Sequence, residues 1–455
     1  MVQIKVKKGL DISIKGKPKG ETIKPLMKPQ EISLNLHCFE DLRLKLLVRV
    51  GDSVKVGQPL VVDKGCERRV IVSPAAGTIK EVRRGLKRRL LNIVVGVADR
   101  EDFVDHGVVN VGKMEANQII EHLLSAGLFA QIRQRPFNVL ADPKKKPRSI
   151  FVKAVETAPL APPAELQVRD HEEDFLLGLA TLAKLTEGAV HLVYHRQSQC
   201  NAFVNAHDVV HHTVEGPHPA ANHSVHIYHI DPIRSHEDVV WTVTVNDVIA
   251  IGFLMRTGTY YVERLLSVGG PGILDDKKGF FAGRLGYPIG GLIAGRNARG
   301  LLRMISGDVL TGNRVELEDF LHFNHYTFSV IPEKGEREFL HFLGLGRDKY
   351  TASRTYFSRL LGLKKEGYEF TTRQHGEPRY FVDGTIYEKV MPMKIPVMHL
   401  IRAIQAKDFE LAEKLGLLEV DAEDFALPAF VCPCKVEMVS IIKQALQTYA
   451  AEILC

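Results

Sequence analysis

Histidines are concentrated between His191 and His236, and some of their spacings could place imidazoles around a metal ion. The two suggestive sets are His207-x-x-x-His211-His212 and His223-x-x-His226-x-x-His229. On a helix, imidazoles at positions i and i+4 share a face and could ligate zinc. Residues 226–230 are predicted to form a strand, however, and odd spacings on a strand alternate faces. No H-E-x-x-H motif, paired cysteine or fixed acidic ligand accompanies them, so surface or interface histidines are favoured over a metal site.

Cysteine is the second residue type with chemical potential, because a close pair of thiols could be redox-active or ligate a cluster. The chain has 6 cysteines, at Cys38, Cys66, Cys200, Cys432, Cys434 and Cys455. They show no repeated spacing, which is typical of reduced cytosolic thiols and not of a disulfide framework. Cys432-Pro433-Cys434 has no further cysteine nearby to complete four thiolates, so a structural or incidental role is favoured.

Clustered glycines suggest a phosphate-binding loop, because glycine lets backbone N–H groups approach a pyrophosphate. They are Gly283, Gly286, Gly290, Gly291 and Gly295. Neither G-x-G-x-x-G nor G-x-x-x-x-G-K-[ST] is present, so turns in a β-rich domain are favoured.

One rigid turn, Gly216-Pro217-His218-Pro219-Ala220, falls at the predicted edge of a sheet. Ligands of open α/β sheets bind at such edges, although the segment is also compatible with a simple loop. The chain has no G-x-S-x-G elbow and no kinase signature, which argues against an autonomous hydrolase or kinase.

The elements that must position these residues belong to a long, ordinary globular chain. It has 455 residues, 45% of them apolar and 25% charged, which predicts three or four compact units. The net charge is +6, with basic runs at residues 83–89 and 144–146. These runs could face anionic lipid, an acidic partner or nucleic acid, but no aromatic platform or nucleic-acid module accompanies them.

Membrane attachment is expected to be peripheral. The apolar stretch at residues 239–254 is interrupted by Thr244, Asn246 and Asp247, and falls short of the roughly 20 residues that a span requires. The first residues alternate charged and apolar side chains without a signal-peptide core, so a cytoplasmic location is expected.

Changes in hydrophobic periodicity divide the chain into four predicted domains, of fold class α/β plus all-β modules. Short strands joined by glycine turns occupy residues 1–110. Residues 111–261 alternate strand and helix, with helices at 114–126 and 172–185 and strands at 149–155, 189–194 and 226–230, and this predicts a doubly wound parallel sheet. Short strands return in residues 262–330. Residues 331–455 are predicted to be mainly helical. The segment 354–361 is followed by a loop and then by helices at 395–406, 409–415 and 436–454.

The first module resembles the biotinyl/lipoyl barrel-sandwich hybrid. The resemblance rests on V-G-D-x-V-x-x-G-Q-P-L at residues 50–60 and S-P-A-A-G-T-I at residues 73–79. Carriers of that family hold their prosthetic group on a lysine in an E-A-M-K-like turn between these motifs. Here Lys64 falls about three residues early and the turn is missing, so an unmodified scaffold is expected.

Nearly the whole chain resembles the family of A subunits of the bacterial sodium-translocating NADH:quinone reductases. Cys434 departs from the family, which commonly has glycine there. The collinear segments that carry the resemblance are residues 8–11, 50–60, 73–77, 135–137, 147–152, 216–220, 247–252, 269–271, 305–307, 354–355, 387–392 and 430–433.

This resemblance implies a peripheral docking or scaffold subunit of a six-subunit respiratory complex, on the cytoplasmic face of the bacterial inner membrane. The complex oxidises NADH, reduces ubiquinone to ubiquinol and exports Na⁺. Its FAD, FMN, riboflavin and iron-sulfur centre are implied to lie in other subunits, so that this chain binds no cofactor and is not catalytic when isolated. The chief partner implied is the quinone-binding integral-membrane subunit.

Kinship with the flavin-bearing subunit of respiratory complex I is also implied, together with a Rossmann-like domain at 111–261 and a β-grasp (SLBB-like) domain at 262–330. Those flavin-bearing relatives hold FMN on a glycine-rich loop, but residues 129–137 here have lost the glycines. Side chains there would obstruct a flavin phosphate. If ubiquinone touches this chain, Arg135, Phe137 and His218 are the candidate residues. The alternatives are a free-standing flavin- or nicotinamide-dependent oxidoreductase and a soluble quinone-binding module.

Overall fold

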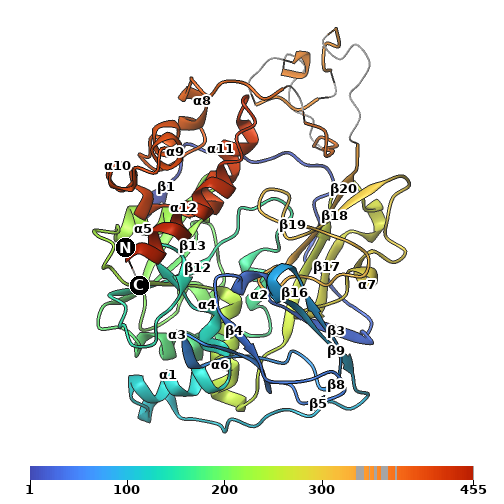
Figure 1. Ribbon diagram of the computed structural model, residues 1–455, viewed down its shortest axis with the longest axis vertical. Helices are drawn as coiled ribbons and strands as arrows, with labels where there is room; N and C mark the ends of the chain where they lie inside the picture. The colour runs from blue at the N-terminus through green and yellow to red at the C-terminus, as the bar shows by residue number, and fades with distance from the viewer. Residues whose placement is uncertain (335–342, 348, 353–355, 360–366, 375–376, 454–455) are drawn as a thin grey trace.

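Four β-sheets and a group of C-terminal helices make up the computed structural model in Figure 1. The structure describes residues 1–334, 343–347, 349–352, 356–359, 367–374 and 377–453. In the view of Figure 1, the strands between residues 31 and 97 lie in the lower part toward the right, and the C-terminal helices lie toward the upper left, near the N-terminus.

Two antiparallel sheets form the N-terminal all-β module. One has the strand order β3-β9-β8-β5 and the other has the order β4-β6-β7. Gly77 shows why its turns need glycine: its φ is +151°, and a Cβ there would lie 1.9 Å from the carbonyl oxygen of Gly96. The strands are β3 (Glu31–Asn35), β4 (Leu44–Leu46), β5 (Ser53–Val54), β6 (Pro59–Asp63), β7 (Cys66–Val72), β8 (Gly77–Arg84) and β9 (Leu90–Val97).

A seven-stranded sheet forms the centre of the molecule, with the order β1-β14-β13-β12-β15-β10-β11. The five strands β1, β14, β13, β12 and β15 are parallel to one another. Strands β10 and β11 are added antiparallel beside β15. The predicted parallel α/β sheet is therefore confirmed, and its Rossmann-like assignment stays a prediction. Its strands are β1 (Gln3–Lys5), β10 (Arg133–Arg135), β11 (Val139–Leu140), β12 (Ser149–Ala154), β13 (Ala189–His195), β14 (Val210–Glu215) and β15 (Val240–Thr244).

The central strand β12 is buried on both faces, which explains its uninterrupted apolar run. Ile150 and Val152 join the core that includes helices α3 (Glu172–Ala183) and α6 (Val245–Thr257). Phe151 joins a second core with helix α5 (His223–Ile230) and the C-terminal helices. The predicted helices at 114–126 and 172–185 are confirmed as α1 (Ala116–Ser125) and α3. The short helices α2 (Ala164–Val168) and α4 (Asn201–Val204) complete this region.

A mixed six-stranded sheet follows, with the order β19-β18-β20-β16-β17-β2. The predicted short strands of this region are confirmed, but β2 (Ile23–Pro25) reaches the sheet from the N-terminal segment and pairs with β17. The β-grasp assignment and the four domain boundaries stay predictions. The remaining elements are β16 (Glu263–Gly269), β17 (Gly279–Arg284), α7 (Ile289–Ile293), β18 (Leu302–Ser306), β19 (Asn313–Val315) and β20 (Thr327–Pro332).

The C-terminal region folds into helices that cover the second face of the central sheet. In α9 (Val397–Gln405), the buried Val397, Leu400, Ile401 and Ile404 recur at helical spacing. The predicted helices at 395–406, 409–415 and 436–454 are confirmed as α9, α10 and α12, except that residue 454 lies outside the described residues. Of residues 354–361, only 356–359 are described, and they include the short 3-10 helix η6 (Phe357–Arg359). The other helices are α8 (Thr385–Glu388), α10 (Phe409–Lys414), α11 (Ala426–Val431) and α12 (Met438–Ile453).

The strand predicted at residues 226–230 is wrong, because His223–Ile230 forms helix α5. Its β-branched and aromatic residues are typical of a strand, but Val225 and Ile227 pack in the core under the C-terminal helices. Tertiary packing thus overrides the local preference. His211 and His212 lie on strand β14 and not on a helix. Within the described residues, no helix is long and apolar enough to cross a membrane.

Candidate functional site

A cavity of about 470 Å³ opens beside the ends of β12 and β15. It is lined by Lys153 at the end of β12, by Glu156 just after that strand, and by Thr242–Val245 at the end of β15. These two strands are neighbours in the sheet, and the chain leaves β12 toward β13 on the other side, so the strand order reverses between them. Open α/β sheets bind their ligands at this kind of switch point.

The three predicted site residues, Arg135, Phe137 and His218, all line this cavity. They are far apart in sequence, since His218 belongs to the loop between β14 and α5, whereas Arg135 ends β10. The structure therefore brings together residues that were separate candidates in the sequence. Their role toward quinone stays a prediction.

Arg135 is 2% exposed and has spare hydrogen-bonding capacity. Its Nη1 donates to the Ser224 hydroxyl at 3.0 Å. Its Nε and Nη2 are buried without a hydrogen-bond partner among the described residues. Buried donors are nearly always satisfied, so an arginine with two idle nitrogens is suited to a ligand that brings oxygen acceptors.

Phe137 and His218 supply one apolar and one polar wall. The Phe137 ring meets Tyr449 of α12 edge-on, with centroids 5.8 Å apart, and its backbone has φ +74°. The Nδ1 atom of His218 lies 3.1 Å from the Thr157 hydroxyl. Burial lowers the pKa of His218, although Asp308 and Glu156 act in the opposite direction. The imidazole is therefore neutral near pH 7 and has one ring donor and one ring acceptor.

A charged pair that no sequence motif marked lies on the floor of the cavity. The Lys153 ammonium is 3.2 Å from the Glu156 carboxylate, and both side chains are largely buried. Burial opposes ionisation of each group. The Lys153 charge nevertheless holds the pKa of Glu156 below its usual value, and the carboxylates of Glu156 and Glu423 raise the pKa of Lys153. Both groups are thus charged at neutral pH.

The Glu156 carboxylate also affects which ligands the cavity can bind. It accepts the backbone N–H groups of Thr157 and Ala158, each at 2.9 Å. In dinucleotide-binding folds, N–H groups after the first strand hold a phosphate. Here the chain's own carboxylate takes that place, and its negative charge repels a phosphate. A second carboxylate, Asp247, lies at the start of α6 and accepts from the Thr244 hydroxyl at 2.7 Å.

Two further acids reach the cavity region from the 3-10 helix η8 (Ala422–Phe425). Burial raises the pKa of Glu423 to about 8, against the influence of Lys153. Asp424 is 1% exposed and accepts a hydrogen bond from the Asn222 amide at 2.8 Å. The sequence around Glu423 gave no sign of this cavity, because the segments that surround Glu423 in the fold lie far upstream in the chain.

A row of three histidines from two modules lies at another side of the cavity, and no sequence motif marked it. His322 stacks on His325 with ring centroids 5.2 Å apart, and His37 contacts His322 at 5.2 Å. Burial lowers the pKa of His322 to about 3 and that of His325 to about 4. Both rings are therefore neutral near pH 7. His37 and His325 line the cavity and add polar surface to its wall, while His322 lies between them in the row.

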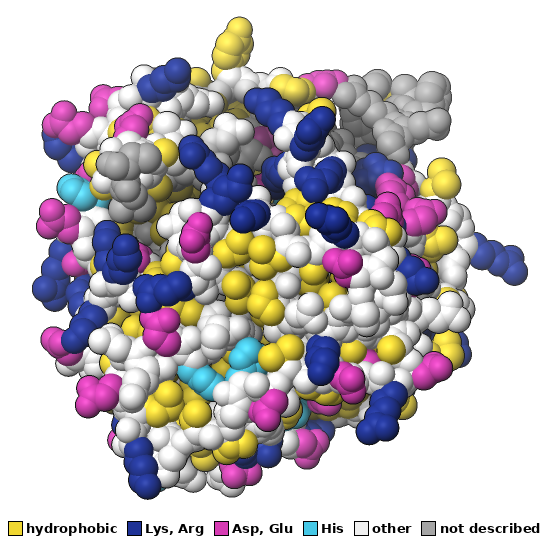
Figure 2. Space-filling model, turned by 60° about the horizontal axis from the view of Figure 1, so that its bottom comes forward, with side chains coloured by type: hydrophobic (Ala, Val, Ile, Leu, Met, Phe, Trp, Pro, Cys, Tyr) yellow, Lys and Arg dark blue, Asp and Glu magenta, His cyan; other side chains and the backbone are white. Residues whose placement is uncertain are grey.

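The outer rim of the cavity is formed by α12 and by the segment after the 3-10 helix η1 (His37–Phe39). Lys443 of α12 forms an ion pair with Glu40, and Gln447 donates to Asp41 at 2.6 Å. The C-terminal helices are thus tied to the N-terminal module across the rim. Figure 2 shows another face of the molecule, on which lysine and arginine side chains gather in the upper middle beside apolar side chains.

Two of the other chemically suggestive residues, Cys38 and His223, also line this cavity, and His223 Nε2 lies 3.2 Å from the Val243 carbonyl oxygen. The remaining ones do not line it. His191 Nδ1 lies 2.9 Å from His212 Nε2, and His226 Nε2 lies 2.9 Å from the Ala220 carbonyl oxygen. Cys432 Sγ lies 3.1 Å from the Tyr387 hydroxyl. The glycines at 283–295 surround β17 and α7. No group of three or more metal-ligating side chains occurs within the described parts of the chain.

Together these features describe a polar, acid-rich cavity with two idle arginine nitrogens and one apolar wall. It is suited to an uncharged ligand whose oxygen atoms accept hydrogen bonds and whose ring can lie against Phe137. It is poorly suited to a nucleotide phosphate, because Glu156 and Asp247 occupy the backbone positions that would bind one.

Comparisons with known proteins identify two domains of the chain. A family model described as the NqrA N-terminal barrel-sandwich hybrid domain matches residues 4–98, and one described as the NqrA second alpha/beta domain matches residues 114–260. A protein of Chlamydia caviae, named as the A subunit of a Na(+)-translocating NADH-quinone reductase, is 35% identical over 99% of this chain and 97% of its own length. The protein of the same name from Cellvibrio japonicus is 36% identical, over 97% of this chain and 98% of its own length.

Among solved structures, an air-oxidized NAD⁺-reducing [NiFe]-hydrogenase is similar at a TM-score of 0.36 and 11% identity, over 77% of this chain and 68% of that chain. A likeness at this level supports no statement about fold or function.

Proposed function

The chain belongs to the NqrA family, the A subunits of the Na(+)-translocating NADH-quinone reductases, and from this premise we propose how it serves that enzyme. It acts as one component of a complex that oxidises NADH, reduces quinone and moves Na⁺ across a membrane. The observation that carries this assignment is 35% identity over 99% of the chain and 97% of the relative. The match therefore includes every domain of the chain.

Within the complex, we infer a docking role at the cytoplasmic face of the membrane. The partners would be the integral-membrane subunits, chiefly the one that binds quinone. FAD, FMN, riboflavin and the iron-sulfur centre would belong to other subunits. The Glu156 and Asp247 carboxylates support this assignment of the cofactors to other subunits. They accept the backbone N–H groups that would otherwise bind the phosphate of a flavin or nicotinamide nucleotide.

We further propose that the cavity receives the ubiquinone head group. The support is the pair of nitrogens on the buried Arg135 that have no hydrogen-bond partner among the described residues. A quinone carbonyl oxygen could accept hydrogen bonds from them. The Phe137 ring offers a face to the quinone ring, and His218 offers a second polar contact at the same cavity. The tail of the quinone would leave toward the rim between α12 and Glu40.

Co-purification tests the docking role most directly. The tagged chain would be recovered from gently solubilised membranes, and the absorbance spectrum of the isolated chain would be recorded. Recovery of membrane flavoproteins with a colourless isolated chain is the expected result. A yellow, partner-free protein would favour a free-standing oxidoreductase instead.

Photo-crosslinking with a quinone bearing a reactive group on its ring tests the cavity. Labelled peptides from residues 131–138, 153–158 or 216–223 are the expected products. Label confined to peptides outside the cavity lining would exclude head-group binding there, and would leave the docking role intact.

A further inference from the structure

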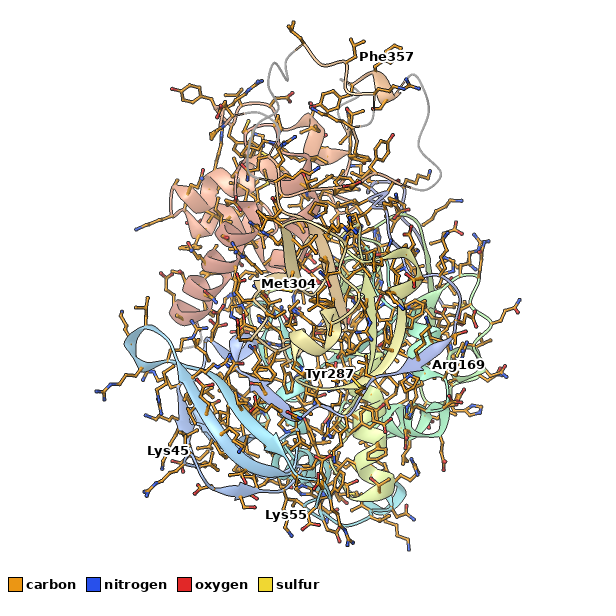
Figure 3. All side chains as sticks on the ribbon, turned by 90° about the vertical axis from the view of Figure 1, so that its right-hand side faces the viewer. Lys45, Lys55, Arg169, Tyr287, Met304 and Phe357 are labelled. Carbon is orange, nitrogen blue, oxygen red and sulfur yellow. The ribbon has the colours of Figure 1, made fainter. Side chains whose placement is uncertain are left out.

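A basic hairpin tip stands apart from the cavity and has no role in the function proposed so far. We call residues 83–89, which join β8 to β9, the basic tip. Its sequence is Arg-Arg-Gly-Leu-Lys-Arg-Arg, so five of its seven side chains are cationic and one is apolar. In Figure 3 the light-blue hairpin that carries it extends from the body on the left, above Lys45.

Backbone hydrogen bonds close the turn of the tip. The Gly85 N–H donates to the Arg89 carbonyl at 2.8 Å, and the Arg89 N–H donates to the Leu86 carbonyl at 3.2 Å. Lys87 and Arg88 have φ values of +54° and +59°, which turn the chain sharply. This turn presents Leu86 to solvent. At 93% exposure, it is the most exposed large apolar side chain among the described residues.

The five cations of the basic tip fall into two groups. Arg83 and Arg89 are bonded to other parts of the chain: Arg83 donates to the Glu318 carbonyl at 3.1 Å, and Arg89 forms an ion pair with Glu40 at 2.6 Å. Arg84, Lys87 and Arg88 form no ion pair with any described residue, and Arg84 donates only to the Arg88 carbonyl, at 3.1 Å. The anchored pair therefore supports the hairpin, while three free cations surround one exposed leucine.

We propose that the basic tip rests on a membrane surface that contains anionic phospholipid. Three unpaired cations attract the phosphate groups of such a surface, and an apolar side chain between them can enter the boundary between headgroups and acyl chains. The long stems of arginine and lysine let the charges stay at headgroup level while Leu86 goes deeper. An acidic protein surface would match the charges but would leave Leu86 without a partner.

This inference rests on the proposed function, because a chain docked on a membrane complex lies next to a bilayer. It adds to that function a direct lipid contact, separate from contacts with the other subunits. The tip would fix the tilt of the N-terminal module on the membrane, since Arg83 and Arg89 tie the tip to the neighbouring loop and to Glu40.

Vesicle sedimentation tests the proposal on the full purified chain. Vesicles of phosphatidylcholine are compared with vesicles that also contain phosphatidylglycerol, at low and at physiological salt. We expect binding only to the anionic vesicles. Reversal of two charges in K87E/R88E should weaken binding at least tenfold, because each basic residue near such a surface contributes roughly fivefold. Leu86→Ser should weaken binding by about tenfold without altering its salt dependence.

The matched control is K144E/K145E, which makes the same change of charge in the other basic run, where both lysines are exposed and no exposed leucine is adjacent. It should bind vesicles nearly as the unaltered chain does. An equal loss in this control would show nonspecific attraction and overturn the proposal, as would failure of the unaltered chain to bind anionic vesicles. Thermal unfolding of each variant confirms that the fold is kept.

Co-purification of the same variants separates this proposal from the proposed function. K87E/R88E and Leu86→Ser should still recover the membrane subunits, although the variant chains should be washed off the membranes at lower salt concentrations than the unaltered chain. If these variants bind vesicles normally but lose the subunits, the tip contacts protein and the lipid proposal is wrong. If the unaltered chain recovers no subunits at all, the docking function fails, whatever the vesicles show.

Discussion

The Lys153 ammonium lies 3.2 Å from the Glu156 carboxylate on the floor of the cavity. Neither residue belongs to a recognisable motif, yet the pair decides the electrostatics of the site. Glu156 accepts the backbone N–H groups after β12, so that they are not available to a phosphate, and Lys153 keeps Glu156 ionised. An open α/β sheet can in this way keep its fold while its switch point excludes a nucleotide.

Glu156→Gln tests the pair. The amide oxygen can still accept from Thr157 and Ala158, but Lys153 loses its nearest negative charge. We expect the free energy of unfolding to fall by about 3 kcal/mol at pH 7, because a buried charge is left without its partner. The pKa of Glu156 is lowered in the folded chain, so its contribution is complete above its ordinary pKa and is lost as pH falls below that value. Urea denaturation at pH 7 and pH 3 should therefore show a larger difference between variant and unaltered chain at pH 7.

The control for this comparison is Glu187→Gln, which removes the carboxylate of the exposed pair between Lys146 and Glu187. Solvent screens that pair, so little change in stability is expected at either pH. Equal effects from the two variants would show that the burial of Lys153 and Glu156 contributes nothing.

Glu423 predicts a pH dependence of the opposite sign. Burial raises its pKa to about 8 in the folded chain, so between its ordinary pKa and pH 8 the folded state holds a proton that the unfolded state has lost. Stability from this residue therefore falls as pH rises through that window and is constant above it. Glu423→Gln removes the dependence. It should stabilise the chain on the order of 2 kcal/mol at pH 8.5, a figure discounted for partial solvent access, and have little effect at pH 5.

Parallel denaturation curves from pH 5 to pH 9 check this outcome, with Glu81→Gln as an exposed control that should leave the slope unchanged. A difference between Glu423→Gln and the unaltered chain that does not grow with pH would show that Glu423 ionises normally in the folded protein.

Gly252→Ala tests the packing of the two helices behind the central sheet. A Cβ at Gly252 would lie 1.7 Å from the carbonyl oxygen of Asp174, and both atoms belong to helices that cannot separate without opening the core. We expect a loss of about 3 kcal/mol or more in the free energy of unfolding. Gly290→Ala is the control, because its new Cβ would meet only the Leu317 carbonyl at 3.4 Å. Chemical denaturation should show it to be neutral or slightly stabilising.

Much of the fold could be predicted from local pattern, and the exceptions have physical causes. Strand β12 has an uninterrupted apolar run because it is buried on both faces. Helix α9 has apolar residues at helical spacing because only one of its faces is buried. Helix α5 was missed because its stability comes from packing against the C-terminal helices and not from its own residue preferences. Strands β1 and β2 join distant sheets through pairings that no local pattern reveals.

The cavity was predictable only in part. Arg135, Phe137 and His218 were marked by the resemblance to a known family, and the structure places them around one space. Glu423 and the histidines at 322 and 325 were not, because each gains its character from burial against a distant segment. Burial of a charged or titratable group is a property of the whole fold, and residue spacing carries little information about it.

Arg135→Lys tests the cavity as a quinone site. Lysine keeps the charge but loses the planar fork, and so cannot both bond Ser224 and offer the two remaining donors. We expect head-group affinity to fall by about tenfold, the effect of losing roughly one hydrogen bond to a charged donor, with co-purification of the membrane subunits unchanged. Competition of unlabelled ubiquinone against photo-crosslinking measures this affinity. Arg264→Lys, at a 4% exposed arginine that does not line the cavity, should leave it unchanged. Equal affinity in Arg135→Lys and the unaltered chain would mean that the idle nitrogens of Arg135 do not bind the quinone.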